Sequence, residues 1–482
     1  MLKHIKLLCC ISLGIAMAGC YKDKGNYDYI DINEVSITSD SSAVVVLQQD
    51  TLRINVQLKQ SMPDAAGLTY EWVFYAANGT PQERRQLGTG KNLTAMISEK
   101  PGNYNLDYFV TDKKTGVSFQ KRFSISVESA FGEGWMVLEE NGGTTDIGLV
   151  TRGKKIFKNI YSTSNKGQKL PAGARDISII QYRGQEIYIL SPADMVQVDY
   201  VDFTKIKRFD QFFYDAPAPK PEGNYLLGGS DKVMYNNGLV YTASTVLPPP
   251  YTFGLPLIGA GEGPYYMEPY PIYSVSEGKF FYDRISQRFF RAGPYDIELS
   301  PCPQFDPAAD AYNMNNIGKK LLYAEHNVTD MHNLLFKNNN NDSLFIYVLD
   351  AGIPNPAVAK YDVTGLPGLL GADHYRMSKT LTYLYYSNGN KVYKLDILAQ
   401  TSTLLYTFPA GTQVADMKMY FNWKDFDDAD NDRLIGIATN EAGHGKLYYF
   451  PLAVTGNFEG NTYRTVFDGF GKINGIAYKS GN

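Results

Sequence analysis

Cysteine is scarce in this chain of 482 residues, and its placement excludes two common kinds of scaffold. Three of the four cysteines lie within the first twenty residues, at Cys9, Cys10 and Cys20. Once those are removed or modified, Cys302 has no partner, so no internal disulfide can form. A zinc site is excluded as well, because such sites need several cysteine or histidine ligands at short spacings.

Signatures of catalysis are also missing. The sequence contains no Gly-x-Ser-x-Gly turn, no His-Glu-x-x-His pair and no phosphate-binding glycine-rich loop. The formal net charge is −4 without any basic block, which argues against nucleic acid as a partner. We therefore expect no enzyme, no cofactor and no nucleic-acid binding. Four scattered histidines lack metal-ligand spacing: His326, His332, His374 and His444.

Only one stretch is long and apolar, and it lies at the N-terminus. Two lysines precede an apolar run of roughly a dozen residues, Leu7 to Ala18, which fits a signal-peptide core and is too short to span a bilayer. The run ends in Met17-Ala-Gly-Cys20, and small residues before a cysteine suit a lipoprotein signal peptidase. We predict that residues 1–19 are a signal peptide and that Cys20 carries the lipid that holds the protein to a membrane.

The mature chain begins with a polar spacer, followed by an alternating pattern. Residues 20–30 are polar and contain glycine, which indicates a flexible tether, and its charges can also act as a sorting signal. Residues 31–128 contain about seven strand-like runs separated by turn residues, with Trp72 in the centre of one run. This pattern predicts an immunoglobulin-like β-sandwich in which Trp72 and Tyr104 are core residues.

Residues 132–482 contain a degenerate repeat. One unit is an apolar-x-apolar-Asp step, whose aspartate can accept a hydrogen bond from its own turn backbone. It occurs at Val196–Asp199, Phe280–Asp283, Ala359–Asp362 and Tyr393–Asp396. A second unit is a small residue, an aspartate and a short strand. It occurs at Asp176, Asp231, Asp330, Asp373 and Asp416, with Asn474 in the corresponding place near the end. Short strands recurring at this period predict a β-propeller.

The two ends of the repeat region complement each other. The last strand, Ile473–Tyr478, resembles an innermost strand that lacks the rest of its blade. Three strands near the start lack an innermost one: Gly134–Leu138, Asp146–Val150 and Ile156–Tyr161. We predict that they pair and close the ring, which removes its sheet edges. This count favours seven blades, although strands cannot be assigned between Val246 and Asn327, and six is the alternative.

Three features are candidates for binding or chemistry. The repeated aspartates could act as the carboxylates of a glycoside hydrolase, yet they recur once per blade, as structural turn residues do. The acidic loop Asp425–Asp432 is similar to calcium loops, but Arg433 and Thr439 stand where the pattern needs Gly and Glu, so metal binding is left unknown. A long, proline-stiffened loop carries the predicted contacts to a ligand or partner: Tyr251, Phe253, Tyr265, Tyr266 and Tyr270.

Several motifs resemble the PKD-like family of lipoproteins. They are Tyr21–Asp28, Tyr70-Glu-Trp72, Pro101-Gly-Asn-Tyr104, Val110-Thr-Asp112 and Gly134–Glu140. The resemblance implies an accessory lipoprotein of the outer membrane, exposed at the cell surface beside a transporter and binding-lipoprotein pair of the starch-utilisation type. Such a protein assists the uptake of oligosaccharides or peptides. We therefore expect a non-catalytic binding protein, with a propeller-fold polysaccharide hydrolase or lyase as the alternative.

Overall fold

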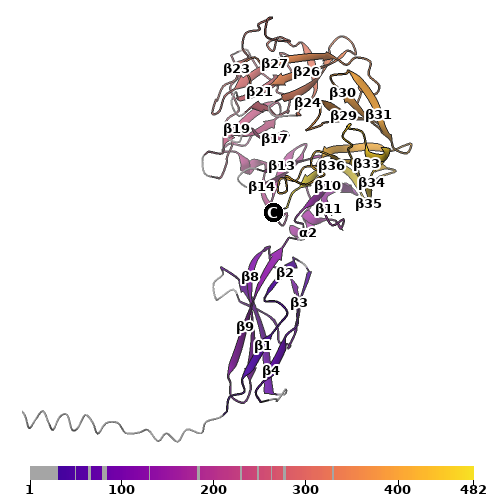
Figure 1. Ribbon diagram of the computed structural model, residues 1–482. Helices are drawn as coiled ribbons and strands as arrows, with labels where there is room; N and C mark the ends of the chain where they lie inside the picture. The colour runs from indigo at the N-terminus through magenta and orange to yellow at the C-terminus, as the bar shows by residue number, and fades with distance from the viewer. Residues whose placement is uncertain are drawn as a thin grey trace, which may run out of the picture. The chain divides into compact units, whose positions relative to one another are not determined.

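The computed structural model describes residues 31–481 with short gaps, and these residues form two compact units (Figure 1). One unit ends at Glu128 and the other begins at Ser129. Within the described residues, no helix is long and apolar enough to cross a bilayer. The predicted signal peptide, the tether and Cys20 lie outside the described residues. The gaps are at 49, 63–66, 79–83, 130, 182–184, 228–230, 247–248, 262, 275–277 and 328–330.

The first unit is a β-sandwich. One layer is a five-stranded sheet in the order β2-β9-β8-β5-β6, in which β2 and β9 run parallel and the other neighbours run antiparallel. The pairs β1-β4 and β3-β7 complete the unit. The strands are β1 (Val35–Thr38), β2 (Ala43–Leu47), β3 (Asp50–Ile54), β4 (Gln57–Gln60), β5 (Leu68–Ala76), β6 (Arg85–Gly88), β7 (Leu93–Ile97), β8 (Gly102–Asp112) and β9 (Ser118–Glu128).

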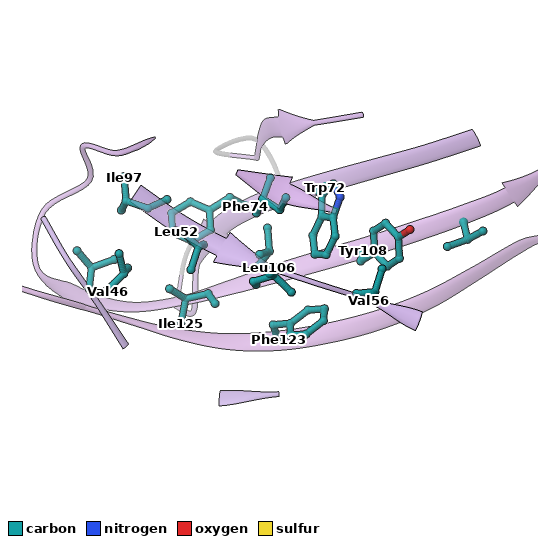
Figure 2. Close-up of a cluster of buried hydrophobic side chains, with 14 of the residues drawn as sticks. Val46, Leu52, Val56, Trp72, Phe74, Ile97, Leu106, Tyr108, Phe123 and Ile125 are labelled. Carbon is teal, nitrogen blue, oxygen red and sulfur yellow. The ribbon is translucent and has the colours of Figure 1, made fainter. Parts of the chain in front are cut away.

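The sandwich core is organised around one tryptophan (Figure 2). Trp72 is fully buried and stacks on Tyr108 with the ring centroids 4.0 Å apart. Its indole N–H donates to the carbonyl of Gly90 at 2.8 Å, which satisfies the one polar group of the side chain. Tyr104 is half-buried and stacks on Phe74 at 4.8 Å. Both residues therefore pack in the core, as the sequence pattern predicted.

The second unit is a seven-bladed β-propeller, which confirms the favoured count. Each blade is an antiparallel sheet of four strands, except the third, which has three among the described residues. The first blade is β36 (Lys472–Lys479), β10 (Gly134–Asn141), β11 (Thr144–Thr151) and β12 (Ile156–Phe157). The second is β13 (Asp176–Gln181), β14 (Gln185–Ser191), β15 (Asp194–Val198) and β16 (Lys205–Arg208), and the third is β17 (Pro221–Leu227), β18 (Asp231–Asn236) and β19 (Leu239–Ser244).

The fourth blade occupies the stretch that the sequence left unassigned. It is β20 (Ile272–Ser274), β21 (Gly278–Asp283), β22 (Arg288–Ala292) and β23 (Ser300–Pro301). The fifth is β24 (Lys319–His326), β25 (Met331–Asn338), β26 (Leu344–Asp350) and β27 (Ala357–Asp362). The sixth is β28 (His374–Met377), β29 (Tyr383–Asn388), β30 (Lys391–Asp396) and β31 (Thr401–Thr407). The seventh is β32 (Gln413–Met419), β33 (Leu434–Glu441), β34 (His444–Pro451) and β35 (Thr465–Phe470).

The ring closes where the two ends of the second unit pair. Strand β36 runs antiparallel to β10, with Lys479 opposite Gly134 and Lys472 opposite Glu140 (Figure 1). A bulge between Leu138 and Glu139 adjusts the register. The predicted closure is therefore confirmed, because β36 covers the edge of β10 that would otherwise be open.

A hydrogen bond between a side chain and a backbone group joins the innermost strands or their entry segments at every one of the seven blade junctions. An innermost strand has unpaired backbone groups along the edge that faces the ring axis, and these bonds satisfy some of them. In chain order of the blades, the pairs are Asn474 to the Ala174 carbonyl, Ser178 to the Asn224 carbonyl, Tyr225 to the Pro269 carbonyl, Tyr270 to the Leu322 carbonyl, the Met377 amide to Glu325, His374 to the Val414 carbonyl and the Ile476 amide to Asp416.

The aspartates of the first repeat unit hold the turns between strands. The side chain of each accepts a hydrogen bond from a backbone N–H two or three residues further on, as predicted. The pairs are Asp199 with Val201 at 2.8 Å, Asp283 with Ser286 at 2.8 Å, Asp362 with Thr364 at 2.9 Å and Asp396 with Ala399 at 3.0 Å.

One local expectation is wrong, and one repeat position differs between blades. The segment Ile156–Tyr161 is not one strand: β12 ends at Phe157 and a short helix, α2, spans Ile160–Ser164. Asn159 between them has φ 54°, a left-handed conformation that ends the extended chain. Asp231 begins a strand as predicted, but this is the second strand of its blade, whereas Asp176 and Asp416 lie on innermost strands. Asp330 lies outside the described residues.

Candidate ligand-binding pocket

A pocket of about 320 Å³ opens between the second and third blades. This volume lies at the lower end of the range for small-molecule sites, which are typically apolar with a few placed polar groups. The third blade contributes Lys232 and the segment that follows β19, and the second blade contributes the rest. The lining residues are Glu186, Tyr188, Gln197, Ile206, Lys207, Phe212, Lys232, Pro249, Pro250, Tyr251 and Phe253.

The aromatic wall of this pocket is the segment from Pro249 to Phe253. Its two prolines have fixed φ angles and no backbone N–H, so the segment is stiff at these positions. Phe253 anchors its end, because the N–H of Phe253 donates to the Phe212 carbonyl at 2.8 Å. The ring of Phe253 is 2% exposed and packs on Phe213 with the centroids 5.5 Å apart. Tyr251 is left half-buried in the wall.

The polar floor of the pocket is an ion pair between the buried Lys232 and the half-buried Glu186. The ammonium of Lys232 lies 2.7 Å from Oε1 and 2.5 Å from Oε2 of Glu186. It also lies 3.2 Å from the hydroxyl of Tyr188, which donates to Glu186 at 2.9 Å. Burial lowers the pKa of Lys232, although Glu186 opposes this, and burial raises the pKa of Tyr188. The ammonium also lies 4.7 Å from the centroid of the Tyr251 ring, within reach of a cation–π contact.

Sequence reasoning missed this floor. Glu186 and Lys232 are 46 residues apart, and each stands near the start of the second strand of its blade. A signal was present, because each charge precedes an apolar strand run, Ile187–Leu190 in one blade and Val233–Tyr235 in the next. Charges at the same place in successive blades are neighbours in a propeller.

The structure brings together two of the five predicted contact residues, Tyr251 and Phe253. Tyr265 and Tyr270 lie elsewhere and use their hydroxyls within the protein. Tyr265 donates to the Leu257 carbonyl at 2.6 Å, and burial raises its pKa to about 12. Tyr270 donates to the Leu322 carbonyl at 2.6 Å as part of the ring of junction bonds. Ligand contact by these residues stays a prediction, and Tyr251 is the one best placed for it.

Tyr266, the fifth predicted contact, is held by close neighbours around its ring and by a bond of its hydroxyl. Gly238 has φ +73°, and a Cβ atom there would lie 2.4 Å from the Tyr266 ring. The Arg284 guanidinium lies 4.3 Å from the ring centroid, and the hydroxyl donates to Glu222. These contacts fix Tyr266 against the third and fourth blades, away from the lining of the pocket.

The repeated aspartates, considered above as hydrolase carboxylates, bind groups of the protein itself. Asp416 lies 3.3 Å from Arg376 and 3.7 Å from Lys418, which also lies 3.5 Å from Asp176. Burial raises the pKa of Asp416, but Lys418 and Arg376 outweigh it, so the net shift is downward. Asp231 pairs with Lys279, and Asp373 accepts a hydrogen bond from the Gly389 amide. Each of these carboxylates therefore has a structural partner.

Two carboxylates of the acidic loop Asp425–Asp432 have partners in the protein, those of Asp428 and Asp430. Asp428 accepts from the Tyr420 hydroxyl at 2.7 Å and lies 3.1 Å from Arg152. Asp430 receives two hydrogen bonds from Arg464, at 2.7 and 3.0 Å. Among the described residues, no group of three or more His, Cys, Asp or Glu side chains could hold a metal ion.

The fold and its pocket define a two-unit all-β protein, a sandwich followed by a seven-bladed propeller with a ligand-sized pocket between two blades. The model of the PKD-like family matches residues 20–173, which cover the sandwich and the start of the propeller. No curated protein matches the chain.

Solved structures with a similar fold share little sequence with this chain. A quinonprotein alcohol dehydrogenase-like protein of Bacteroides thetaiotaomicron is 13% identical with a TM-score of 0.45, and the match covers 91% of this chain and 97% of that one. A DUF4784 family protein of Bacteroides caccae is 9% identical with a TM-score of 0.30, over 94% and 100%. The WD40 domain of SCAP from fission yeast is 7% identical with a TM-score of 0.24, over 70% and 75%. Likeness at this level gives no information about function.

Proposed function

We propose that this protein is a lipoprotein, tethered through Cys20 to the outer membrane and exposed at the cell surface. Its propeller binds an oligosaccharide or a peptide without converting it, and the protein assists uptake alongside an outer-membrane transporter and its binding lipoprotein. The match of the PKD-like family model to residues 20–173 supports this proposal, as does the lipobox that ends at Cys20.

The observation that carries the binding function is the state of Glu186. It is the one carboxylate among the described residues that line the pocket, and both of its oxygens are occupied by Lys232 and Tyr188. Glycoside hydrolases need two carboxyl groups about 5 to 9.5 Å apart, one of them free to give or take a proton. The pocket therefore supports binding better than hydrolysis.

The chemistry of the pocket suits a ligand with apolar faces and many acceptor oxygens. Tyr251, the two prolines and Ile206 supply apolar contact, and rigid aromatic residues make such contacts at low entropic cost. Lys207 and Gln197 supply hydrogen-bond donors, whereas the Lys232 ammonium already donates to Glu186 and Tyr188. The pocket lining contains two lysines and one glutamate, so it is slightly positive. This favours the hydroxyl, carbonyl or carboxylate oxygens of a sugar or a peptide.

The test is a binding screen of the purified propeller-containing chain against glycan and peptide panels. We expect Tyr251→Ala to weaken binding on the order of tenfold or more, as hot-spot aromatic residues do. Tyr295→Ala is the matched control, because Tyr295 is 61% exposed on the fourth blade and is absent from the pocket lining. Release of new reducing ends from a bound polysaccharide would instead favour the hydrolase or lyase alternative.

A further inference from the structure

A second aromatic surface lies on the loop that joins β32 to β33 in the seventh blade. Trp423 is 52% exposed and Phe426 is 68% exposed, while Phe421 is half-buried. The three rings meet edge to face, with centroids 4.7 Å apart for Phe421 and Trp423, 5.9 Å for Phe421 and Phe426, and 6.1 Å for Trp423 and Phe426. We call these three residues the aromatic platform.

The loop beneath the aromatic platform is held by buried polar bonds. Asn422 is 1% exposed. Its backbone N–H donates to Asn431 Oδ1 at 2.6 Å, and its side-chain amide donates to Glu133 at 2.9 Å. The backbone N–H of Trp423 donates to the hydroxyl of Ser480 at 2.9 Å. With the ion pairs of Asp428 and Asp430 described above, these bonds fix the backbone that carries the exposed rings. An exposed tryptophan held in this way gains little burial energy for the fold, so it marks a contact surface.

The exposed charges of the loop that carries the aromatic platform balance. The exposed charged side chains of this loop are Lys424, Asp425, Asp427 and Arg433, two of each sign. A cationic or anionic partner therefore finds no net electrostatic attraction here. A neutral partner with an apolar face is favoured, provided that its polar groups can bond the charged side chains at the rim.

A peptide strand fits this surface less well than a sugar. Strand addition needs unpaired backbone donors, but the backbone amides of Trp423 and Lys424 already have partners within the protein. The backbone N–H of Trp423 donates to Ser480, and the backbone N–H of Lys424 donates to Asn422 Oδ1 at 3.1 Å. A sugar ring offers an apolar C–H face for stacking on an aromatic ring, and its hydroxyls point outward, where carboxylates and an ammonium can bond them.

We propose that the aromatic platform is a second carbohydrate site, on which a neutral sugar ring stacks on Trp423 and bonds Lys424, Asp425 and Asp427 through its hydroxyls. The connections between the first and second strands of all blades lie on one face of a propeller. The aromatic platform and the charged floor of the pocket, near the starts of β14 and β18, therefore share that face. The inference rests on the proposed function in taking an oligosaccharide as ligand, and it adds a subsite for a longer glycan.

Native affinity electrophoresis tests this site with the full-length mature chain. The gels contain a neutral polysaccharide (an α-glucan, a β-glucan, a xylan or a mannan) or the anionic polygalacturonate. We expect Trp423→Ala to lose affinity for a neutral glycan on the order of tenfold, and Trp423→Phe to keep most of it because a stacking face remains. Leu398→Ala is the control, since Leu398 is 58% exposed on the sixth blade. Thermal unfolding of each variant verifies its fold.

Four results would overturn the inference. The first is a wild-type chain that binds no neutral glycan, and the second is a Trp423→Ala variant that binds every glycan as the wild type does. The third is Trp423-dependent sedimentation with phosphatidylcholine vesicles in place of glycan binding, and the fourth is a dimer that Trp423→Ala dissociates. If only Tyr251→Ala loses glycan binding, the pocket is supported as the binding site and the proposed site at the aromatic platform is refuted. If only Trp423→Ala loses glycan binding, the site at the aromatic platform is supported and the pocket is refuted as the binding site.

Discussion

Asp416 and Ile476 are joined across the junction between the seventh and first blades, where the carboxylate of Asp416 accepts the backbone N–H of Ile476 at 3.1 Å. Asp416 lies on the innermost strand of the seventh blade, and Ile476 lies on β36, the innermost strand of the first. Together with the pairing of β36 and β10, this bond makes closure depend on the last residues of the chain.

Deletion of Ile473–Tyr478 should destabilise the whole second unit. The deletion reopens the ring, leaves β10 with unpaired backbone groups at an apolar interface and removes the Ile476 amide that Asp416 accepts. The sandwich should stay folded, because it has its own core around Trp72. Circular dichroism melts and limited proteolysis measure both units, and a truncated chain that melts like the full chain contradicts closure.

Tyr270→Phe should lower the free energy of unfolding by about 1 to 3 kcal/mol, because the Leu322 carbonyl loses its donor at a blade junction. Tyr225→Phe should act similarly through the Pro269 carbonyl. Tyr295→Phe, at an exposed position, is the control and should change nothing measurable. Urea unfolding gives the values. If Tyr270→Phe is as stable as the wild type but loses ligand binding, Tyr270 is a ligand contact and not a structural residue.

Phe253 and Tyr251 should separate folding from binding. Phe253→Ala should cost about 3 to 5 kcal/mol of stability, since the ring is almost fully buried between Phe213 and the third blade. Tyr251→Ala should cost about 1 kcal/mol or less and still abolish most ligand binding. Chemical unfolding and the binding screen are run on the same samples. A large loss of stability in Tyr251→Ala would show that this ring is packing.

Cys20→Ala should release the protein from membranes or leave it unprocessed. Stable attachment needs acyl chains, each of which contributes about 0.8 kcal/mol per buried methylene, and two or more chains hold a protein firmly. Fractionation of cells followed by detection of the protein in membrane and soluble fractions measures the effect. Normal cleavage with unchanged membrane retention would refute the lipid anchor.

His332 should make the propeller sensitive to acid. It is 1% exposed, and burial lowers its pKa to about 3, with His326 and Lys379 acting in the same direction and Tyr273 and Glu325 opposing them. The unfolded chain takes up this proton near pH 6.5, so the contribution to stability is fully present above that value and is lost as the pH falls toward 3. The slope should reach at most about 1.4 kcal/mol per pH unit.

The measurement for His332 is the free energy of unfolding against pH. His332→Gln should flatten the slope between pH 6.5 and 3, while His444→Gln should not, because His444 is exposed. Equal slopes in the wild type and His332→Gln would show that other groups dominate acid unfolding.

The sequence by itself determined the order of units and the ring. Alternation around Trp72 indicated the sandwich, and the turn aspartates, such as Asp199 and Asp396, marked strand ends. These signals are local, because a turn bond or a strand alternation is decided within a few residues. Even the closure could be inferred, since the missing innermost strand at one end matched the surplus strand Ile473–Tyr478 at the other.

Only the tertiary structure decided which side chains meet. Tyr251 and Tyr270 stand in one aromatic loop and look equivalent in sequence, yet Tyr270 bonds a carbonyl 52 residues away and Tyr251 faces a pocket. The Lys232–Glu186 floor joins residues 46 apart, and the exposure of Trp423 follows from bonds of its loop to the C-terminal segment. The physical reason is that burial and pairing depend on which blades are adjacent, and that contact is set by packing over long sequence distances.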